Sequence, residues 1–143
     1  MEYLSKIIFI FLTIINLSAN SYAFAESNAG ASALSDTSEI NKLNELGYGS
    51  RLSDPAQTLS YARKALSKAK KINYINGIAE AYRIIGIGKF YKNESESSYD
   101  NFLTSLSYFQ KARNKEGEAK VYNNIGNLYR DVDYDKSLEY FQK

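Results

Sequence analysis

The sequence predicts an all-α fold in which helix-turn-helix units stack side by side as a solenoid. Three observations support this prediction: a single proline in 143 residues, apolar residues at helical spacing, and an internal repeat with a period of about 40 residues. A single proline suits long helices and argues against a turn-rich sandwich or barrel. A fixed period of this size is typical of a helical repeat array.

The repeat emerges when the sequence is shifted by 40 positions against itself. The shift superposes two stretches, GIAEAYRIIG and GEAKVYNNIG, with four identities at helical spacing: Gly77, Ala79, Tyr82 and Gly86 fall on Gly117, Ala119, Tyr122 and Gly126. The same phase continues toward the N-terminus and gives three copies, at about 37–76, 77–115 and 116–143, of which the last is incomplete. Each copy is expected to fold as two helices.

The expected helices alternate between two kinds. First helices are predicted at about 37–52, 78–92 and 116–131, and second helices at about 55–73, 95–113 and from 134 onward. Their apolar residues recur every three or four positions, as in an amphipathic helix.

Helix starts and breaks support these bounds. Two pairs have the spacing of a capping box, Asp36 with Glu39 and Asn93 with Glu96. Asp54-Pro55 places a good cap before a proline at the first helical position. Asn76-Gly77 is expected to break the chain between the first two units.

Residues 1–25 have the features of a secretory signal peptide. Lys6 precedes a nine-residue apolar run at 7–15, and Ala23-Phe24-Ala25 supplies an A-x-A cleavage pattern. The alternatives are an uncleaved anchor or a buried strand. Cleavage after Ala25 would leave a flexible linker at 26–35 and a repeat domain at 36–143. We therefore expect an exported protein, located in the periplasm or cell envelope of a bacterium or secreted.

The C-terminal end falls in the middle of the repeat pattern. The second helix of the third copy would continue beyond Lys143 by the same phase. We therefore expect an N-terminal piece of a longer protein. The mature part contains no run long enough to span a bilayer, and a membrane anchor further along is left open.

Composition excludes several kinds of chemistry. Without cysteine or histidine the chain cannot form a zinc finger, a disulfide or a histidine-dependent nucleophile. A formal net charge of +2 gives no reason to expect a nucleic acid partner. No pair of carboxylates has a catalytic setting, so we expect no enzyme activity, no cofactor and no metal.

Three further patterns have simpler explanations. Gly86 to Lys89 imitates a phosphate loop but lacks the following Ser or Thr, so we interpret Gly86 as a packing glycine. Asp131 to Asp135 imitates the start of a calcium loop but lacks the glycine and the glutamate that such a loop needs. The cations between Arg63 and Lys71 are interpreted as a solvated helix face, with a basic surface for an anionic partner as the alternative.

The repeat resembles the tetratricopeptide family, most closely in the third copy, through Tyr122, Ile125, Gly126, Tyr129, Tyr134, Ser137 and Phe141. The family's packing positions correspond to Gly47, Gly86 and Gly126, to Thr58, Ser98 and Ser137, and to Tyr82, Tyr122, Tyr129, Phe102 and Phe141. The resemblance implies a right-handed α-solenoid of two and a half to three repeats. The period of 40 exceeds the common 34, and the first copy has Ala62 at the aromatic position. HEAT-type repeats are the structural alternative.

The family phase also implies a groove along the first helices. It would be lined by three columns of residues: Asn44, Arg83 and Asn123; Tyr48, Ile87 and Asn127; and Arg51, Phe90 and Arg130. Amide, arginine and aromatic side chains suit an extended peptide. The combined change Arg83→Glu and Asn127→Ala is expected to abolish partner capture while helicity remains.

Two functions fit these observations. The first is a non-catalytic module that binds a protein or peptide partner. The second is suggested by long-period tetratricopeptide arrays, which resemble the N-terminal sensor regions of bacterial signalling proteins; the chain would then sense a ligand in the periplasm for a histidine kinase or regulator output. Self-association through an exposed repeat edge is a third way in which the surface could be used.

Overall fold

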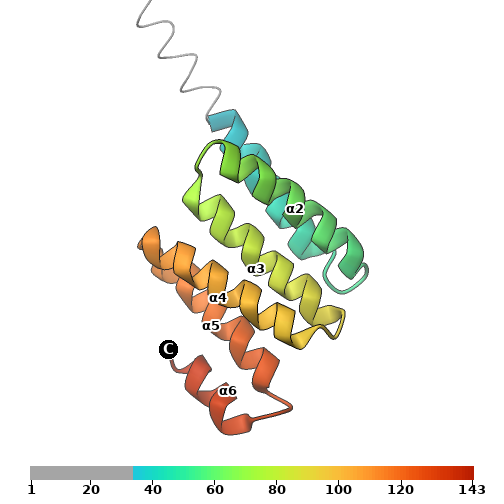
Figure 1. Ribbon diagram of the computed structural model, residues 1–143, viewed down its shortest axis with the longest axis vertical. Coiled ribbons are helices and arrows are strands. Elements are labelled where there is room, and N and C mark those ends of the chain that lie inside the picture. The colour runs from blue at the N-terminus through green and yellow to red at the C-terminus, as the bar shows by residue number, and fades with distance from the viewer. Residues whose placement is uncertain (1–33) are drawn as a thin grey trace, which may run out of the picture. The chain divides into compact units, whose positions relative to one another are not determined.

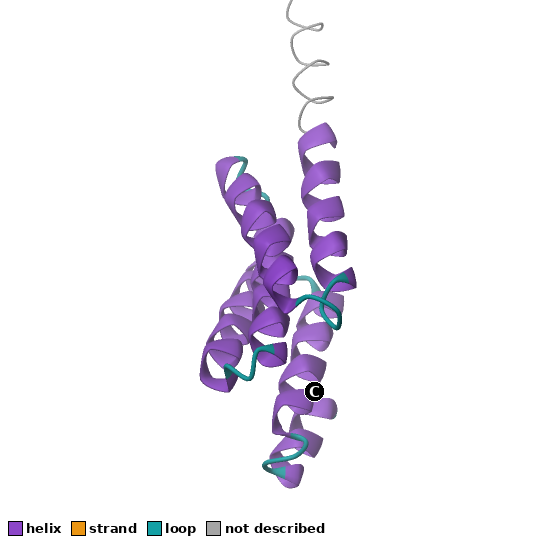
Figure 2. Cartoon of the chain, turned by 90° about the vertical axis from the view of Figure 1, so that its right-hand side faces the viewer, coloured by secondary structure: helices purple, strands orange, loops and turns teal. Residues whose placement is uncertain are grey.

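In the computed structural model, the described residues, 34–143, form helices joined by short turns and contain no strand (Figures 1 and 2). A first helix covers residues 34–49, and it is followed by α2 (Pro55–Lys71), α3 (Ile75–Tyr91), α4 (Ser95–Lys111), α5 (Lys115–Tyr129) and α6 (Tyr134–Phe141). The all-α prediction is confirmed. None of the helices in this range is long and apolar enough to cross a membrane.

The predicted signal peptide and most of the predicted linker lie outside the described residues. Residues 34 and 35 are helical, so the last two linker positions already belong to the first helix. By its internal contacts the chain divides between Ser35 and Asp36, and the compact unit described below spans Asp36–Lys143.

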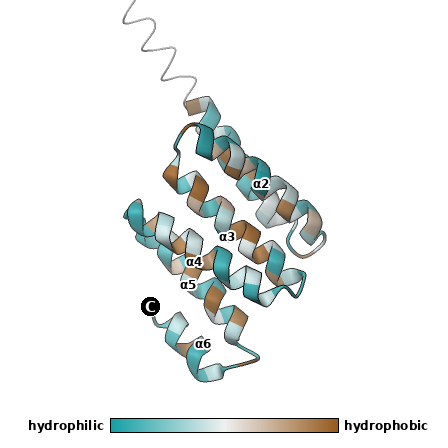
Figure 3. Ribbon diagram, in the orientation of Figure 1, coloured by the Kyte–Doolittle hydropathy of each residue, from teal (hydrophilic) through white to brown (hydrophobic). Residues whose placement is uncertain are grey.

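Within this unit, each helix from α2 onward packs against the next one along the chain, and α3 also contacts α5. Among α2 to α6 there is no corresponding contact between α2 and α4. The helix α3 therefore has neighbours on several sides, and its residues are the most consistently apolar (Figure 3). The buried residues of α3 include four isoleucines, Ile78, Ile84, Ile85 and Ile87, and several glycines.

From α2 to α5, successive helices begin 20 residues apart, and the same kind of turn ends α2, α3 and α4. Asn73, Asn93 and Arg113 each adopt a positive φ, of 53°, 61° and 54°. After each of them a backbone N–H reaches back five residues: Tyr74 to Ala69, Glu94 to Lys89 and Asn114 to Phe109, with N···O distances of 2.9–3.0 Å. This is the Schellman arrangement, in which a left-handed residue lets the chain satisfy the last carbonyls of a helix.

Three of the predicted capping or helix-breaking residues were wrong. Asn76 and Gly77 lie in the first turn of α3, and the break between units is made by Asn73. Asn93 is the left-handed residue of its turn, so Glu94 takes the N-cap position, without a side-chain cap bond. Asp36 lies inside the first helix, which is already helical at residue 34.

The cap predicted at Asp54 is confirmed. Its carboxylate accepts a hydrogen bond of 2.9 Å from the Gln57 N–H, and Pro55 occupies the first helical position. The side chains of Asn114 and Asp133 cap α5 and α6 in the same way. Asp133 thus belongs to the stretch that imitated a calcium loop and serves as a helix cap.

Two helix pairs close on each other through the same three-residue contact. A Cβ on Gly86 would lie 2.6 Å from the Phe102 ring, and one on Gly126 would lie 2.5 Å from the Phe141 ring. In the same pairs, Ser98 donates to the Gly86 carbonyl and Ser137 to the Gly126 carbonyl, each at 2.8 Å. Since only glycine leaves room for the ring, this contact fixes how closely α3 and α4, and α5 and α6, approach.

The first pair uses a looser version of this contact. A Cβ on Gly47 would meet the Ile84 side chain at 3.1 Å, the Thr58 carbonyl at 3.3 Å and the Tyr61 Cβ at 3.4 Å, so its three nearest neighbours include no ring atom. Thr58 is buried but donates to the Asp54 carbonyl within its own helix. Ala62, which stands at the aromatic position, is fully buried. The small side chain allows α2 to pack without an inserted ring.

The predicted tyrosines are half-buried and pack against other tyrosines. Tyr82 stacks on Tyr108, with ring centroids 5.8 Å apart, and Tyr122 lies 6.4 Å from Tyr140. Tyr129 stacks on Tyr140 at 6.0 Å. The hydroxyls of Tyr99 and Tyr140 are 3.2 Å apart, and this hydrogen bond, followed by partial burial, raises the pKa of Tyr140. At the α4–α5–α6 end, half-buried tyrosines therefore pack around a buried cluster that includes Val121 and Ile125.

We expect Gly86→Leu to destabilise the domain severely, because the new side chain would displace the Phe102 ring from its place on the helix. Overpacking of this kind costs about 3 kcal/mol, a large share of a domain's stability. Urea unfolding followed by circular dichroism would measure the loss. Gly49→Leu is the matched control, because a Cβ on Gly49 meets nothing within 4 Å; equal losses in both variants would contradict the close-approach explanation.

We expect Arg113→Gly to stabilise the domain by about 0.5–1 kcal/mol, because Arg113 is held at a positive φ that only glycine adopts without steric cost. Thermal unfolding would measure the gain. Arg130→Gly is the control: Arg130 has an ordinary helical φ of −51°, so glycine there should be neutral or destabilising. A gain at Arg130 and none at Arg113 would show that the turn conformation is not the cause.

Candidate ligand groove

The nine residues predicted to line a groove are brought together in the structure, where they line two adjoining hollows. The first hollow, of about 510 Å³, is lined by Asn41, Asn44, Glu45, Tyr48, Glu80, Arg83, Lys120, Asn123 and Asn124. The second, of about 280 Å³, is lined by Tyr48, Arg51, Ile87, Phe90, Tyr91, Phe102, Asn123, Asn124, Asn127 and Arg130. Tyr48, Asn123 and Asn124 belong to both, so we call the two hollows together the groove.

The nine residues differ strongly in exposure. Asn44, Arg83 and Ile87 are only 3%, 7% and 4% exposed, so they form the floor of the groove. Ile87 also belongs to the apolar cluster around Phe102, which makes it a core residue that reaches the groove. Asn123 on α5 and Arg130, which caps the C-terminus of α5, are exposed. The groove therefore has a buried floor on the first helix and α3 and a more accessible wall on α5.

Arg83 is held by its own chain and is not free to bind a ligand. Its Nε and Nη2 donate to the two carboxylate oxygens of Glu80 at 3.0 and 2.6 Å, and its Nη1 donates to Asn124 Oδ1 at 3.0 Å. The bond to Asn124 ties α3 to α5, while the two bonds to Glu80 lie within α3. Arg83→Glu would place two carboxylates together in a nearly closed site, so we no longer expect that variant to keep its fold, and Arg83 is unsuitable for testing ligand binding.

Asn44 has one unsatisfied polar atom. Its Nδ2 donates to the Gly77 carbonyl over a long 3.4 Å, while its Oδ1 is buried and accepts no hydrogen bond from the described residues. An acceptor left in this state costs about 1–3 kcal/mol. The sequence pattern placed Asn44 in the groove but could not show that half of its amide is unpaired.

The second hollow has cations at two of its edges. The Arg51 guanidinium lies 3.9 Å from the centre of the Tyr48 ring and donates to the Tyr48 carbonyl. Arg51 forms no ion pair with any described carboxylate, while Arg130 Nε lies 3.3 Å from Asp131 Oδ1 at the surface. No acidic residue lines this hollow. Its electrostatic character is therefore positive.

Sequence reasoning missed a fourth column of the groove. Asn41, Glu80 and Lys120 lie one turn before Asn44, Arg83 and Asn123 and share their repeat offset. Extending the predicted columns by one helical turn toward the N-terminus would have found them. Glu80 is the important omission, because it changes the role of Arg83.

Lys120 is also paired within the chain. Its Nζ lies 2.6 Å from Glu116 Oε1, one turn away on α5. This hydrogen-bonded ammonium lowers the pKa of the Glu116 carboxyl below its usual value. Both side chains are largely exposed, so the pair is weak and screened by salt.

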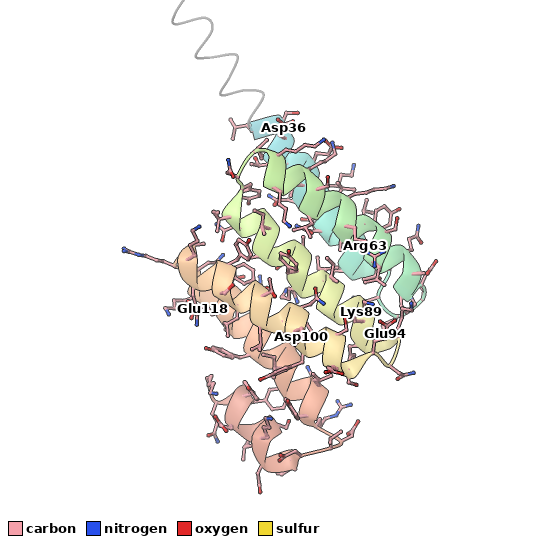
Figure 4. The ribbon with its side chains drawn as sticks, viewed as in Figure 1. Asp36, Arg63, Lys89, Glu94, Asp100 and Glu118 are labelled. Atoms are coloured by element: carbon pink, nitrogen blue, oxygen red, sulfur yellow. The ribbon has the colours of Figure 1, made fainter. Side chains whose placement is uncertain are left out.

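Lys89 forms an ion pair with a residue close to it in the chain. Lys89, from the stretch that imitated a phosphate loop, lies inside α3 and pairs with Glu94 at the following turn (Figure 4). Lys92 lies 3.2 Å from the same carboxylate, and the bonds from Lys89 and then Lys92 lower the pKa of Glu94. Within residues 34–143 no group of acidic side chains could hold a metal ion.

Comparisons with models of protein families, with curated proteins and with solved structures found no match to this chain. The interpretation of the groove therefore depends on its own geometry and chemistry.

We expect Glu80→Gln to destabilise the domain by about 2 kcal/mol, because it leaves the nearly buried Arg83 guanidinium without its counter-charge. Chemical denaturation would measure the change. Glu116→Gln removes the same charge from an exposed pair and should cost much less, because solvent and salt already screen that pair. Losses of similar size in the two variants would mean that burial of Arg83 does not strengthen its pair.

Proposed function

We propose that this chain is a non-catalytic module that binds an extended peptide segment of a partner protein in the groove, and that its helices form tetratricopeptide-like solenoid repeats. The observation that carries the proposal is the convergence on two adjoining hollows of all nine residues that the phase of the resembled family implied. A phase derived from a peptide-binding repeat would not be expected to outline a continuous hollow in an unrelated helical bundle.

The repeated contacts support the solenoid part of the proposal. The Gly-Phe-Ser contact occurs in two successive helix pairs, 40 residues apart. The helices α3 and α5 touch while α2 and α4 do not. Such an arrangement fits a curved stack with the first helices of each pair on the inner side, where the groove lies.

The side chains of the second hollow suit a peptide. Asn127 and Asn123 offer amides that can bond to an extended backbone, and Phe90 offers an apolar surface. Arg51 and Arg130 supply cations for a carboxylate. Export to the cell envelope, inferred from residues 1–25, belongs to the same proposal. In a signalling protein this groove would hold the sensed ligand.

The experiment is selection of binders from a phage-displayed library of random dodecapeptides on the immobilised full chain, followed by fluorescence polarisation with the synthetic peptides. We expect Asn127→Ala combined with Arg130→Ala to weaken binding by about tenfold or more, equivalent to about 1.4 kcal/mol. Neither side chain is buried, so the fold should remain intact.

The control variant combines Gln110→Ala with Lys111→Ala on α4. It also removes one amide and one cation from exposed positions, but outside the groove. It should bind the selected peptides as the unmodified chain does. Failure to select any peptide, or equal losses in both double variants, would reject the groove as the binding site.

A further inference from the structure

The two hollows of the groove differ in the charge that the chain leaves unmatched. In the second hollow, Arg51 forms no ion pair with a described residue, and no acid lines the wall. In the first hollow the lining charges are Glu45, Glu80, Arg83 and Lys120. The formal sum is zero, so the pairing of each charge decides the character of the site.

Both cations of the first hollow are already matched. Arg83 donates three hydrogen bonds, two to Glu80 and one to Asn124, and is 7% exposed. Lys120 is paired with Glu116, which does not line the hollow. A ligand carboxylate would have to displace the chain's own glutamate to reach Arg83. The first hollow is therefore a poor site for an acidic group.

The acceptors of the first hollow, in contrast, have unused capacity. Glu45 is exposed on the wall and forms no ion pair with the described residues. The Glu80 side chain is 28% exposed, and its carboxylate oxygens can accept further bonds beyond those from Arg83. The unmatched charge of this hollow is negative.

A buried atom points to the same kind of ligand. Asn44 lines the first hollow, is 3% exposed, and its Oδ1 accepts no hydrogen bond from the described residues. The amide is held only by the 3.4 Å bond from Nδ2 to the Gly77 carbonyl. A small rotation of the amide toward the hollow would let a bound donor satisfy this oxygen. A ligand group rich in donors would therefore relieve a cost that the free protein carries.

We infer that the first hollow binds the cationic side chain of a lysine or arginine in the partner peptide. This inference depends on the proposed peptide-binding function and specifies its ligand. Glu45 and Glu80 supply the counter-charge, and Asn44 supplies a hydrogen-bond acceptor. Since Arg51 and Arg130 lie at the second hollow, the unmatched charge of the groove changes from negative at the first hollow to positive at the second. A bound peptide therefore places its basic residue at the first hollow and its acidic group at the second.

The test uses four small probes on the ¹⁵N-labelled full chain: the N-acetyl N′-methylamides of lysine, arginine, norleucine and glutamate. The side-chain amide resonances of Asn41 and Asn44, which line the first hollow and not the second, report binding in the first hollow. We expect the lysine or arginine probe to shift them, and the norleucine and glutamate probes to leave them unchanged. Norleucine has a lysine-like aliphatic chain without the charge, so it separates charge recognition from apolar contact.

Two variants locate the effect. Glu45→Gln should lower the affinity for the cationic probes by about fivefold, which is the effect expected for a partly exposed charge interaction. Asp100→Asn removes one charge from the exposed face of α4 and should leave binding unchanged (Figure 4). Shifts of equal size with norleucine, stronger shifts with glutamate, or no shift with either cationic probe would overturn the inference.

The phage-selected peptides separate this inference from the proposed function. Their lysine or arginine residues would be replaced by norleucine, and their affinities measured for the unmodified chain and for Glu45→Gln. Peptides that bind in the groove but show no loss on either change would leave the proposed function standing and refute the assignment of the first hollow. A loss of affinity both on replacement by norleucine and in Glu45→Gln would support the proposed function and the assignment of the first hollow together.

Discussion

The close approach of paired helices at Gly86 and Gly126 is the constraint on which the rest of the structure depends. A phenylalanine ring lies where a Cβ would be, and a serine hydroxyl on the facing helix bonds the glycine carbonyl. The ring supplies apolar contact area, while the serine satisfies a backbone acceptor buried in the contact. Because the two features coincide, the facing helices have one packing distance and one register. Sliding by a residue would lose both the ring contact and the hydrogen bond.

The turns transmit this register along the chain. Asn73, Asn93 and Arg113 recur every 20 residues in the left-handed conformation, so α2, α3, α4 and α5 begin at equal intervals. Equal helices joined by equal turns bring residues 40 positions apart to corresponding places on neighbouring units. Glu80 and Lys120, which are 40 positions apart, are lined up in this way, and Asn41 on the first helix lies 39 positions before Glu80. A groove thus arises from regularity of the backbone, and its chemistry from the residues placed at the repeated positions.

The electrostatics of the groove follow from which charges the chain satisfies internally. Arg83 ties α3 to α5 through Asn124 while its charge is matched by Glu80, so it serves stability at a position that suggested binding. A free arginine at the same place would attract carboxylates, whereas a closed pair leaves the neighbouring Glu45 to set the local sign. The groove therefore combines a structural ion pair on its floor with unmatched charges of opposite sign on its walls. Its polarity is a property of pairing, since the lining residues of the first hollow have no formal net charge.

The sequence by itself determined the class of fold and most of the helix bounds, because each depends on spacing along one chain, and its resemblance to a repeat family implied which residues would line a groove. The phase of the resembled repeat family, applied to all three copies, placed Asn44, Arg83 and Asn123 in one column, with Asn44 39 positions before Arg83 and Asn123 40 positions after it. The sequence also identified Gly86 and Gly126 with Phe102 and Phe141. It could not show that Asn73, and not Gly77, makes the turn between units, since both residue types tolerate that conformation. Only the tertiary structure decided that Glu80 and Asn124 close around Arg83 and that Asn44 keeps an unpaired oxygen, because hydrogen-bond pairing depends on distances between helices that no spacing along the chain contains.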